Sequence, residues 1–199
     1  MARDSSKPDF WETRYREHVT PWDAGKVPAS LQAFASGLPR GVRILIPGCG
    51  SAYEAAWLAD AGFDVLAIDF SPAAVEAACR TLGKRSGIVR EADFFTFDPG
   101  RKFDVVYERA FLCALPRRMW PGYAPRCAQL LAPGGVIAGF WFFADTPKGP
   151  PFGTSDAELG TLMSPLFARI GDEPVADSIE VFRGRERWQV WRRASDPAA

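Results

Sequence analysis

The sequence predicts a single α/β domain with a doubly wound, mainly parallel sheet. Apolar runs of strand length alternate with helical patterns along most of the chain, which is the arrangement of strands that pair in parallel under helices on both faces. The first apolar run also ends in a glycine turn that leads directly into a helix, as in the first strand–helix unit of such sheets. A length of 199 residues fits one domain and leaves little room for two.

Strand and helix signals alternate after residue 40. The buried strand VRILIPGCG runs into a glycine turn, and the helix YEAAWLADAG ends at Gly62. The unit then repeats with the strand FDVLAID, followed by Ser71 as N-cap and Pro72 at the first helical position. The other expected elements are a short strand at 87–93, a strand at 103–108, a proline-interrupted helical stretch over 116–131 and an apolar strand at 136–143.

The two ends of the chain fall outside this alternation. Residues 9–20 place Trp11, Tyr15 and Val19 four positions apart, which predicts one stripe of a short helix. The turn PWDAGKVP separates it from a second helix containing Leu31 and Phe34. Near the other end, 175–182 and 187–193 flank the turn GRE and predict a terminal hairpin, and the Pro- and Gly-rich 146–155 predicts a shaped loop.

Composition limits the partners. The 24 basic and 24 acidic residues give a formal net charge of zero, so there is no broad field for nucleic acid or an anionic membrane. The longest apolar run, 136–144, is far shorter than the roughly 20 residues that cross a bilayer, and the polar start is unlike a signal peptide. We expect a cytoplasmic protein that binds neither nucleic acid nor membrane, and a monomer, because no heptad pattern is present.

Cysteine and histidine usage excludes several chemistries. Cys49, Cys79, Cys113 and Cys127 are widely spaced with no CxxC pair, which disfavours a structural metal site and a disulfide scaffold. The only histidine, His18, would have to be the base of any Ser-His-Asp or Cys-His arrangement. We therefore predict neither a bound metal nor a histidine-dependent nucleophile.

The glycine turn and one acidic residue point to a nucleotide-like ligand. Gly48 and Gly50 at the end of a buried strand allow a ligand to approach the peptide groups closely. Asp69 stands nineteen residues past Gly50, at the end of the second strand, where a carboxylate can accept two hydrogen bonds from ribose hydroxyls. This combination predicts a cofactor that contains adenosine.

Both a nicotinamide dinucleotide and S-adenosylmethionine contain adenosine. Tyr53 occupies the position of the third glycine of GxGxxG, which weakens a pyrophosphate cradle. The third strand instead ends in Glu91-Ala92-Asp93-Phe94, where an acid could accept from the adenine amine and Phe94 could cover the ring. These details favour S-adenosylmethionine.

Several motifs then occur in a characteristic order. GCGxA, the Asp69 carboxylate, EAD-F, FDVV and LLAPGG resemble class I S-adenosylmethionine-dependent methyltransferases. Within that class, FWETRYREHVTPWDAG, IPGCGSAYEAAWLADAGFDVLAIDFS, FLCALP and GPPF resemble the thiopurine S-methyltransferase family, especially its plant halide, thiocyanate and thiol methyltransferases and their bacterial relatives. The resemblance runs from about Phe10 to Arg193 and implies an enzyme with a Rossmann-like, seven-stranded sheet and S-adenosylmethionine as cofactor.

The resemblance also implies roles for individual residues. The N-terminal segment, 1–40, becomes a helical lid over an α/β core, 41–199, and closes over the cofactor. In these relatives an aromatic residue usually follows the acid after the fourth strand, whereas here Glu108 is followed by Arg109. The implied cofactor-binding residues are Trp11, Tyr15, Trp22, Gly48, Asp69, Asp93, Phe94, Glu108 and Arg109.

The methyl acceptor is expected to be a small molecule with a soft nucleophile, such as a thiol or a thiol-like anion. Methyl transfer from a sulfonium needs alignment more than a strong base, which suits a chain with one histidine. Phe152 stands where plant halide and thiocyanate relatives have tyrosine, which implies a less polar pocket. Candidate pocket residues are Phe111, Phe152 and Arg187, with Leu112, Trp141, Phe142 and Pro151 beside them.

Two alternatives remain open from the sequence. One is an N- or O-methyltransferase of a small secondary metabolite on the same fold, which an acceptor screen would separate. The other is a nicotinamide-binding module, which titration with both cofactors would separate. No residue of the sequence can be assigned as a catalytic base.

Overall fold

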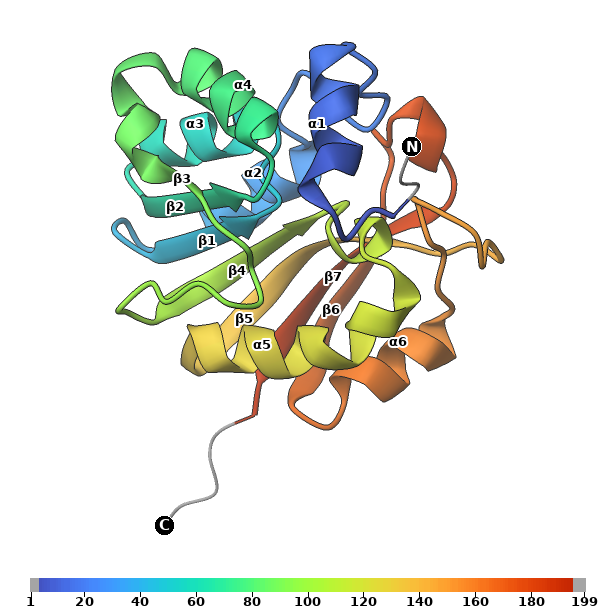
Figure 1. Cartoon of the computed structure of the whole chain (residues 1–199). Coiled ribbons are helices and arrows are strands. Elements are labelled where there is room, and N and C mark those ends of the chain that lie inside the picture. The colour runs from blue at the N-terminus through green and yellow to red at the C-terminus, as the bar shows by residue number, and fades with distance from the viewer. Residues whose placement is uncertain (1–3, 195–199) are drawn as a thin grey trace.

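A seven-stranded sheet forms the centre of the computed structural model, which describes residues 4–194. Its strands lie in the order β3-β2-β1-β4-β5-β7-β6, and all run parallel except β7, which is antiparallel to both of its neighbours (Figure 1). The doubly wound, mainly parallel architecture predicted from the sequence is confirmed. The strands are β1 (Arg43–Pro47), β2 (Asp64–Asp69), β3 (Val89–Glu91), β4 (Phe103–Arg109), β5 (Leu131–Phe142), β6 (Phe167–Pro174) and β7 (Glu186–Arg193).

Helices cover the two faces of the sheet in different groups. Helices α2, α3 and α4 lie on one face and α5 and α6 on the other, while α1 lies beside α4 at the end of the sheet where the N-terminus enters (Figure 1). The helices are α1 (Pro8–Arg16), α2 (Ala29–Ser36), α3 (Tyr53–Asp60), α4 (Pro72–Leu82), α5 (Tyr123–Leu130) and α6 (Asp156–Met163). Short 3₁₀ helices span Gly83–Ile88, Leu112–Ala114, Arg117–Gly122 and Glu180–Phe182.

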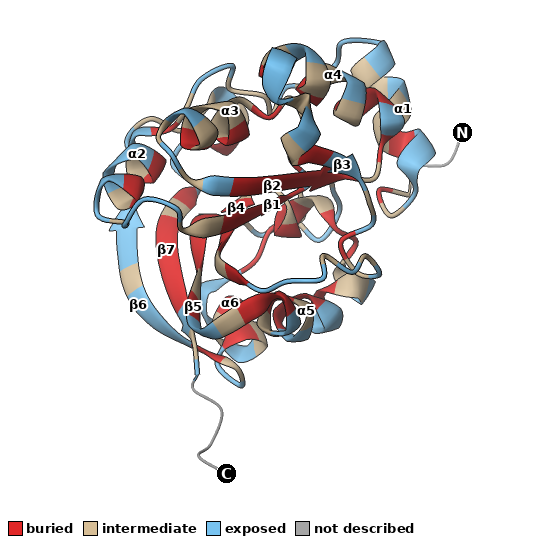
Figure 2. Ribbon diagram, turned by 90° about the vertical axis from the view of Figure 1, so that its left-hand side faces the viewer, coloured by how far each residue is buried: buried red, intermediate tan, exposed pale blue. Residues whose placement is uncertain are grey.

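The central strands are buried on both faces. In β1, Ile44 and Ile46 face the core beneath α2–α4, whereas Leu45 between them faces the core beneath α5 and α6. Figure 2 shows the same strands as continuous buried ribbons, while β6 at the sheet edge is largely exposed. This double burial is why β1, β2, β4 and β5 read as unbroken apolar runs in the sequence.

The start of α4 follows the predicted capping chemistry. Ser71 is the N-cap, its hydroxyl accepts a hydrogen bond from the Ala74 N–H at 3.3 Å, and Pro72 occupies the first turn. Because β2 ends at Asp69, this cap fixes the path of the chain between the strand and the helix.

The C-terminal hairpin prediction is wrong for its first strand. The partner of β7 is β6, Phe167–Pro174, while 175–182 forms a connection that ends in a 3₁₀ helix. Most side chains of β6 are exposed, so its sequence carries no apolar alternation, and its pairing with β7 defines it as a strand. Helix α6, which precedes β6, has no counterpart in the predicted elements.

The first helix is shorter than the apolar stripe predicted. Helix α1 ends at Arg16, so Trp11 and Tyr15 share its cavity-facing side while Val19 lies beyond it and is 52% exposed. Helix α2 is part of the same core cluster as β1, through Leu31 and Ala35. The division into a lid, 1–40, and a core, 41–199, stays a prediction.

A single carboxylate joins α1 to α4. Glu12 Oε2 accepts hydrogen bonds from the Ala73 N–H at 2.8 Å and from the Ser71 hydroxyl at 3.1 Å. The Ala73 hydrogen bond is the main cause that lowers the pKa of Glu12. The negative charge therefore lies at the positive end of α4, where it is stabilising.

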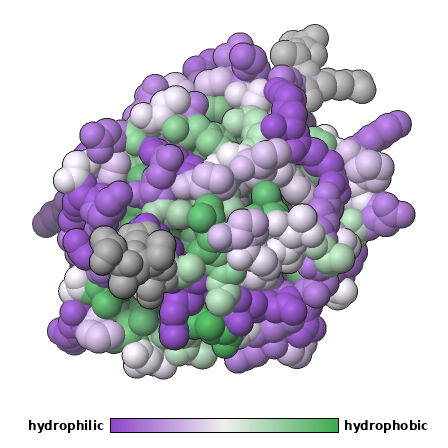
Figure 3. Space-filling view, turned by 90° about the horizontal axis from the view of Figure 1, so that it is seen from below, coloured by the Kyte–Doolittle hydropathy of each residue, from purple (hydrophilic) through white to green (hydrophobic). Residues whose placement is uncertain are grey.

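No helix among residues 4–194 is long and apolar enough to span a membrane. On the side formed by α5 and α6, hydrophobic patches alternate with hydrophilic groups (Figure 3). Val19 and Ile170 are the large hydrophobic residues that stand out as exposed in the described part of the chain. The monomer stays a prediction.

We predict that Glu12→Ala destabilises the fold by about 1–2 kcal/mol, because α4 loses a charged acceptor at its N-terminus. The measurement is the urea midpoint of unfolding. Glu76→Ala is the matched control, since Glu76 also pairs on α4 (with Arg80, 2.7 Å) but is exposed, and such pairs contribute about 0.2–0.5 kcal/mol. Equal losses in the two variants would contradict the capping role of Glu12.

Candidate functional site

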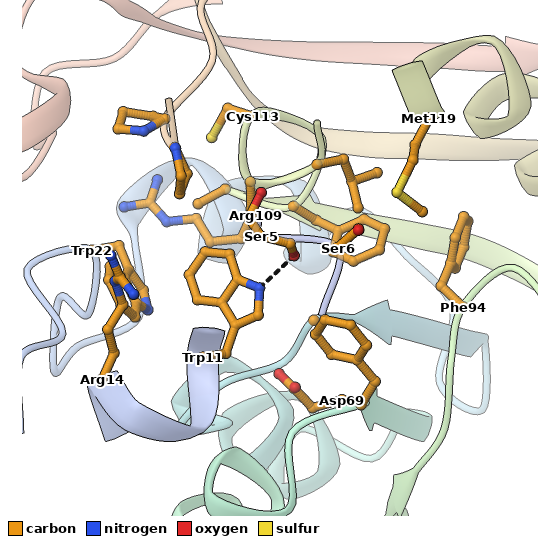
Figure 4. A pocket seen from close by; sticks show the side chains of 18 of the residues that line it. Ser5, Ser6, Trp11, Arg14, Trp22, Asp69, Phe94, Arg109, Cys113 and Met119 are labelled. Atoms are coloured by element: carbon orange, nitrogen blue, oxygen red, sulfur yellow. Dashed lines mark hydrogen bonds between the residues drawn. The ribbon is translucent and has the colours of Figure 1, made fainter. Parts of the chain in front are cut away.

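A cavity of about 400 Å³ lies at the carboxyl ends of β1 to β4, with α1 along one side (Figure 4). This volume is within the range of small-molecule sites. Parallel strands bring their carboxyl ends to one edge of the sheet, so residues distant in sequence meet there. Predicted site residues that line the cavity are Trp11, Tyr15, Trp22, Gly48, Asp69, Asp93, Phe94, Arg109, Phe111 and Pro151.

The glycine turn after β1 allows two aromatic side chains to lie against the backbone. Gly48 and Gly50 have φ angles of +58° and +52°, a region that favours glycine. A Cβ on Gly48 would stand 2.5 Å from the Phe111 ring, and one on Gly50 would stand 2.5 Å from the Tyr15 hydroxyl. The absence of both Cβ atoms therefore shapes this part of the cavity.

Asp69 joins the glycine turn to the start of α4. Its Oδ2 accepts from the Gly50 N–H at 3.1 Å and its Oδ1 from the Ser71 N–H at 3.0 Å. Burial raises the pKa of Asp69 to about 6, although both hydrogen bonds act in the opposite direction. Each oxygen keeps a further lone pair, and the residue lines the cavity (Figure 4), so it can accept from a bound hydroxyl.

One end of the cavity is aromatic and apolar. Phe94 is buried there, and its ring meets the Phe111 ring edge-on with centroids 5.1 Å apart. Met119 lies at the same end (Figure 4). Asp93 is exposed, and its Oδ1 accepts from the Phe95 N–H at 2.8 Å.

The N-terminal aromatics form a cluster on the opposite side. The ring of Trp22 packs edge-on against Trp11 and Tyr15, with centroids 5.3 and 6.2 Å away. Trp11 Nε1 donates to the Ser5 carbonyl at 2.8 Å. Burial, followed by the nearby Asp69 charge, raises the pKa of Tyr15, which keeps its hydroxyl protonated.

Asp23 connects this N-terminal segment to the glycine turn. Its Oδ2 accepts from the Ser51 hydroxyl, and its Oδ1 accepts from the Gly25 N–H at 2.9 Å. The motif TPWDAG therefore has a structural function in placing Trp22 beside the cavity. The motif was visible in the sequence, but the contact with Ser51 was not.

The two charged residues that end β4 face different ways. Arg109 lines the cavity. Its Cζ atom lies 4.3 Å from the Phe140 ring centroid, and its Nη1 pairs with Oε1 of buried Glu186 at 3.0 Å. Glu108 lies outside the cavity lining, and its Oε1 accepts from the N–H groups of Phe111 (2.7 Å) and Leu112 (3.1 Å). Burial raises the pKa of Glu108 to about 7.

The predicted acceptor residues separate into two groups. Phe111 lines the cavity, whereas Phe152 packs against the core and its N–H donates to the Cys113 carbonyl at 2.7 Å. Arg187 lies on β7, where its Nε donates to Asp172 at 2.5 Å, and it does not line the cavity. Leu112, Trp141 and Phe142 belong to the hydrophobic core clusters.

Other cavity residues had no sequence signal. They come from the N-terminal segment before β1, the chain between β4 and α5 and the segment before β7, so only the tertiary fold places them together. These residues include Ser5, Ser6, Arg14, Cys113, Met119 and Phe182.

A second, smaller cavity of about 60 Å³ adjoins the glycine turn and shares Gly48 and Arg109 with the large one. Its lining contains charges of both signs, from Asp23 and Glu54 and from Lys26 and Arg109. Burial raises the pKa of Glu54. A group with both an ammonium and a carboxylate, such as the end of an amino acid, is complementary to this lining.

Comparison with known proteins identifies the family. The family model for thiopurine S-methyltransferase matches residues 6–194. The chain belongs to the thiopurine S-methyltransferase family. A probable thiol methyltransferase 2 of Arabidopsis thaliana is 32% identical, with 98% of this chain and 88% of the relative covered. A thiocyanate methyltransferase 1 of Brassica oleracea is 30% identical, covering 92% of this chain and 84% of the relative.

Solved structures show the same fold. An N1-methyltransferase of 1,6-didemethyltoxoflavin from Burkholderia thailandensis superposes with a TM-score of 0.73 at 18% identity, covering 94% of this chain and 87% of that one. A protein studied in the conversion of a disulfide bond into a thioacetal group during echinomycin biosynthesis gives 0.77 at 18% identity, covering 96% and 94%. This protein is an S-adenosylmethionine-dependent methyltransferase of small molecules, as predicted.

We predict that Gly50→Ala weakens binding of S-adenosylhomocysteine at least tenfold in calorimetry, because the new methyl displaces the Tyr15 hydroxyl from the turn. Gly100→Ala is the control, since Gly100 has a φ of +66° but open space around its Cβ position. Both variants lose stability through backbone strain. Equal affinities for the two variants would argue against a role of the turn in binding.

The raised pKa of Asp69 predicts a pH dependence of cofactor binding. Above about pH 6 the side chain is a carboxylate that accepts hydrogen bonds, and below that pH it is increasingly protonated. Affinity for S-adenosylhomocysteine should therefore fall as the pH is lowered from 7.5 to 5. Asp69→Asn should bind more weakly but show a flat profile over that range. A sloping profile in the variant would assign the effect to another group.

Proposed function

We propose that this protein transfers the methyl group of S-adenosylmethionine to the sulfur of a small thiol held in the large cavity. The observation that carries the proposal is an apolar acceptor side whose own described residues include no histidine or carboxylate; the cavity's carboxylates, Asp69 and Asp93, lie at the carboxyl ends of β2 and β3. His18 lies outside the lining, and the Tyr15 pKa is raised. An acceptor that ionises by itself fits such a cavity.

The residues around the cavity fit the cofactor. Asp69 would accept from ribose hydroxyls, Phe94 and Met119 would enclose the adenine, and the small cavity beside the glycine turn would take the amino-acid end. The ring faces of Trp11 and Tyr15 would stabilise a sulfonium cation. When bound, S-adenosylmethionine supplies an activated methyl group and a neutral thioether leaving group.

The acceptor side is formed by residues after β4, β5 and before β7. Pro150, Pro151 and Phe182 supply apolar walls that exclude water and hold the acceptor in line with the methyl group. Burial raises the pKa of Cys113 well above its ordinary value, so this protein thiol stays protonated and is a poor competitor for the methyl group. The acceptor thiol gives its proton to solvent and its sulfur lone pair to the methyl carbon.

We further infer that the protein acts in the cytoplasm. All four cysteines are free, and Cys49, Cys113 and Cys127 are buried, which is typical of a reducing compartment. We also propose that the protein is a monomer, as expected from the sequence. Size-exclusion chromatography with light scattering would measure its molar mass in solution.

We predict that the rate follows the ionisation of the acceptor. With two thiols of different pKa, kcat/KM should rise with pH and level off near each thiol's own pKa, about 8.5 for a cysteine-like thiol. His18→Ala should leave both profiles unchanged, because His18 does not line the cavity. The proposal fails if a hydroxyl or amine is methylated much faster than any thiol, or if both thiols give one common, enzyme-determined pKa.

A further inference from the structure

One cation faces the large cavity without a carboxylate partner. Arg14, on α1, lines the cavity beside Trp11 and Trp22 (Figure 4). Building on the proposed function, we propose that Arg14 binds the carboxylate of the acceptor, so that the preferred substrates are small thiols that also carry a carboxylate.

The guanidinium of Arg14 is held in place by its own helix. It stacks over the Phe10 ring, with the Arg14 Cζ atom 3.5 Å from the ring centroid, and its Nη1 donates to the Phe10 carbonyl at 2.8 Å. Phe10 is buried, so the ring that supports the guanidinium is packed in the protein interior. A guanidinium has five N–H donors, and the remaining ones are available to a ligand.

The charge of Arg14 is not neutralised locally. No carboxylate oxygen lies within 4 Å of it in the structure over residues 4–194, and Glu17 acts on it only at longer range. By contrast Arg109, the other cation of the cavity wall, is paired with Glu186. Burial lowers the pKa of Arg14. This partly desolvated cation will attract an anion more strongly than an exposed one.

The position of Arg14 favours the acceptor over the cofactor. Figure 4 shows it at the opposite end of the cavity from Phe94 and Met119. A cation there repels the sulfonium, so it does not serve that group. The cofactor's own carboxylate has an alternative partner in the small cavity, which Lys26 lines and Arg14 does not. An anionic group on the acceptor remains as the partner of Arg14.

A carboxylate is the anion that best matches this site. The planar guanidinium fork binds the two oxygens of a carboxylate in parallel, which orients the ligand as well as holding it. The apolar walls on the acceptor side then receive the thiol end. The acceptor is thus recognised at its carboxylate end and methylated at its thiol end.

The experiment compares 3-mercaptopropionate with 3-mercaptopropionamide, a neutral acceptor of the same size, in the wild-type enzyme and in Arg14→Gln. We expect the variant to raise KM for the carboxylate by about 10–100-fold with little change in kcat, as for loss of a hydrogen bond to a charged group. KM for the amide should stay within about twofold, and Arg14→Lys should restore part of the loss.

Two further measurements isolate the role. Calorimetry on the complex with S-adenosylhomocysteine should show weaker binding of the product 3-(methylthio)propionate in Arg14→Gln, with unchanged affinity for S-adenosylhomocysteine itself. Arg16→Gln is the matched control, because Arg16 is on the same helix, is exposed and lies outside the cavity lining. It should behave as the wild type.

Each contrary result has a distinct meaning. Equal losses for the acid and the amide, or a tenfold loss of S-adenosylhomocysteine affinity, would overturn the proposal for Arg14 while leaving thiol methylation intact. If Arg16→Gln raised KM for the carboxylate as much as Arg14→Gln does, the effect would come from the net charge of α1 and not from a contact with Arg14. That result would also overturn the proposal. Failure of the wild type to methylate any thiol would instead overturn the proposed function on which it rests.

Discussion

The buried carboxylate of Asp69 is the contact on which the site depends. By accepting from the N–H groups of Gly50 and Ser71, it holds the turn after β1 and the start of α4 at fixed positions beside the cavity. Keeping a carboxylate there costs free energy, as its raised pKa shows. The same desolvation strengthens any hydrogen bond that it accepts from a ligand.

The N-terminal segment is held to this centre by two more acids. Glu12 caps the N-terminus of α4, and Asp23 accepts a hydrogen bond from Ser51 in the turn after β1. The N-terminal segment is therefore attached to the same two loops that Asp69 joins. The aromatic cluster and Arg14 are consequently positioned by polar contacts with the sheet domain and by the packing of Phe10. The aromatic cluster and Arg14 therefore depend on the same supports as the glycine turn.

Sequence reasoning was most successful where a residue's role is local. The strand runs, the Ser71 cap and the glycine turn depend on neighbouring residues, and the structure confirms all three. The sequence did not predict strand β6, because its exposed residues show no apolar alternation and form a strand only by pairing with β7. The family motifs led to residues that meet at one cavity, yet the structure places Glu108 and Arg187 outside its lining.

The sequence by itself determined the fold class and pointed to the cofactor, because double burial of parallel strands and the geometry of a glycine turn leave marks at short sequence range. The family followed from the resemblance of several motifs to those of known methyltransferases. Only the tertiary structure decided which side chains share the cavity. Arg109 meets Glu186 across 77 positions, and Arg14 on α1 lines the same cavity as residues from the loops after β4 and β5. Such contacts arise from the packing of whole elements, and their charge balance depends on distances that no local pattern encodes.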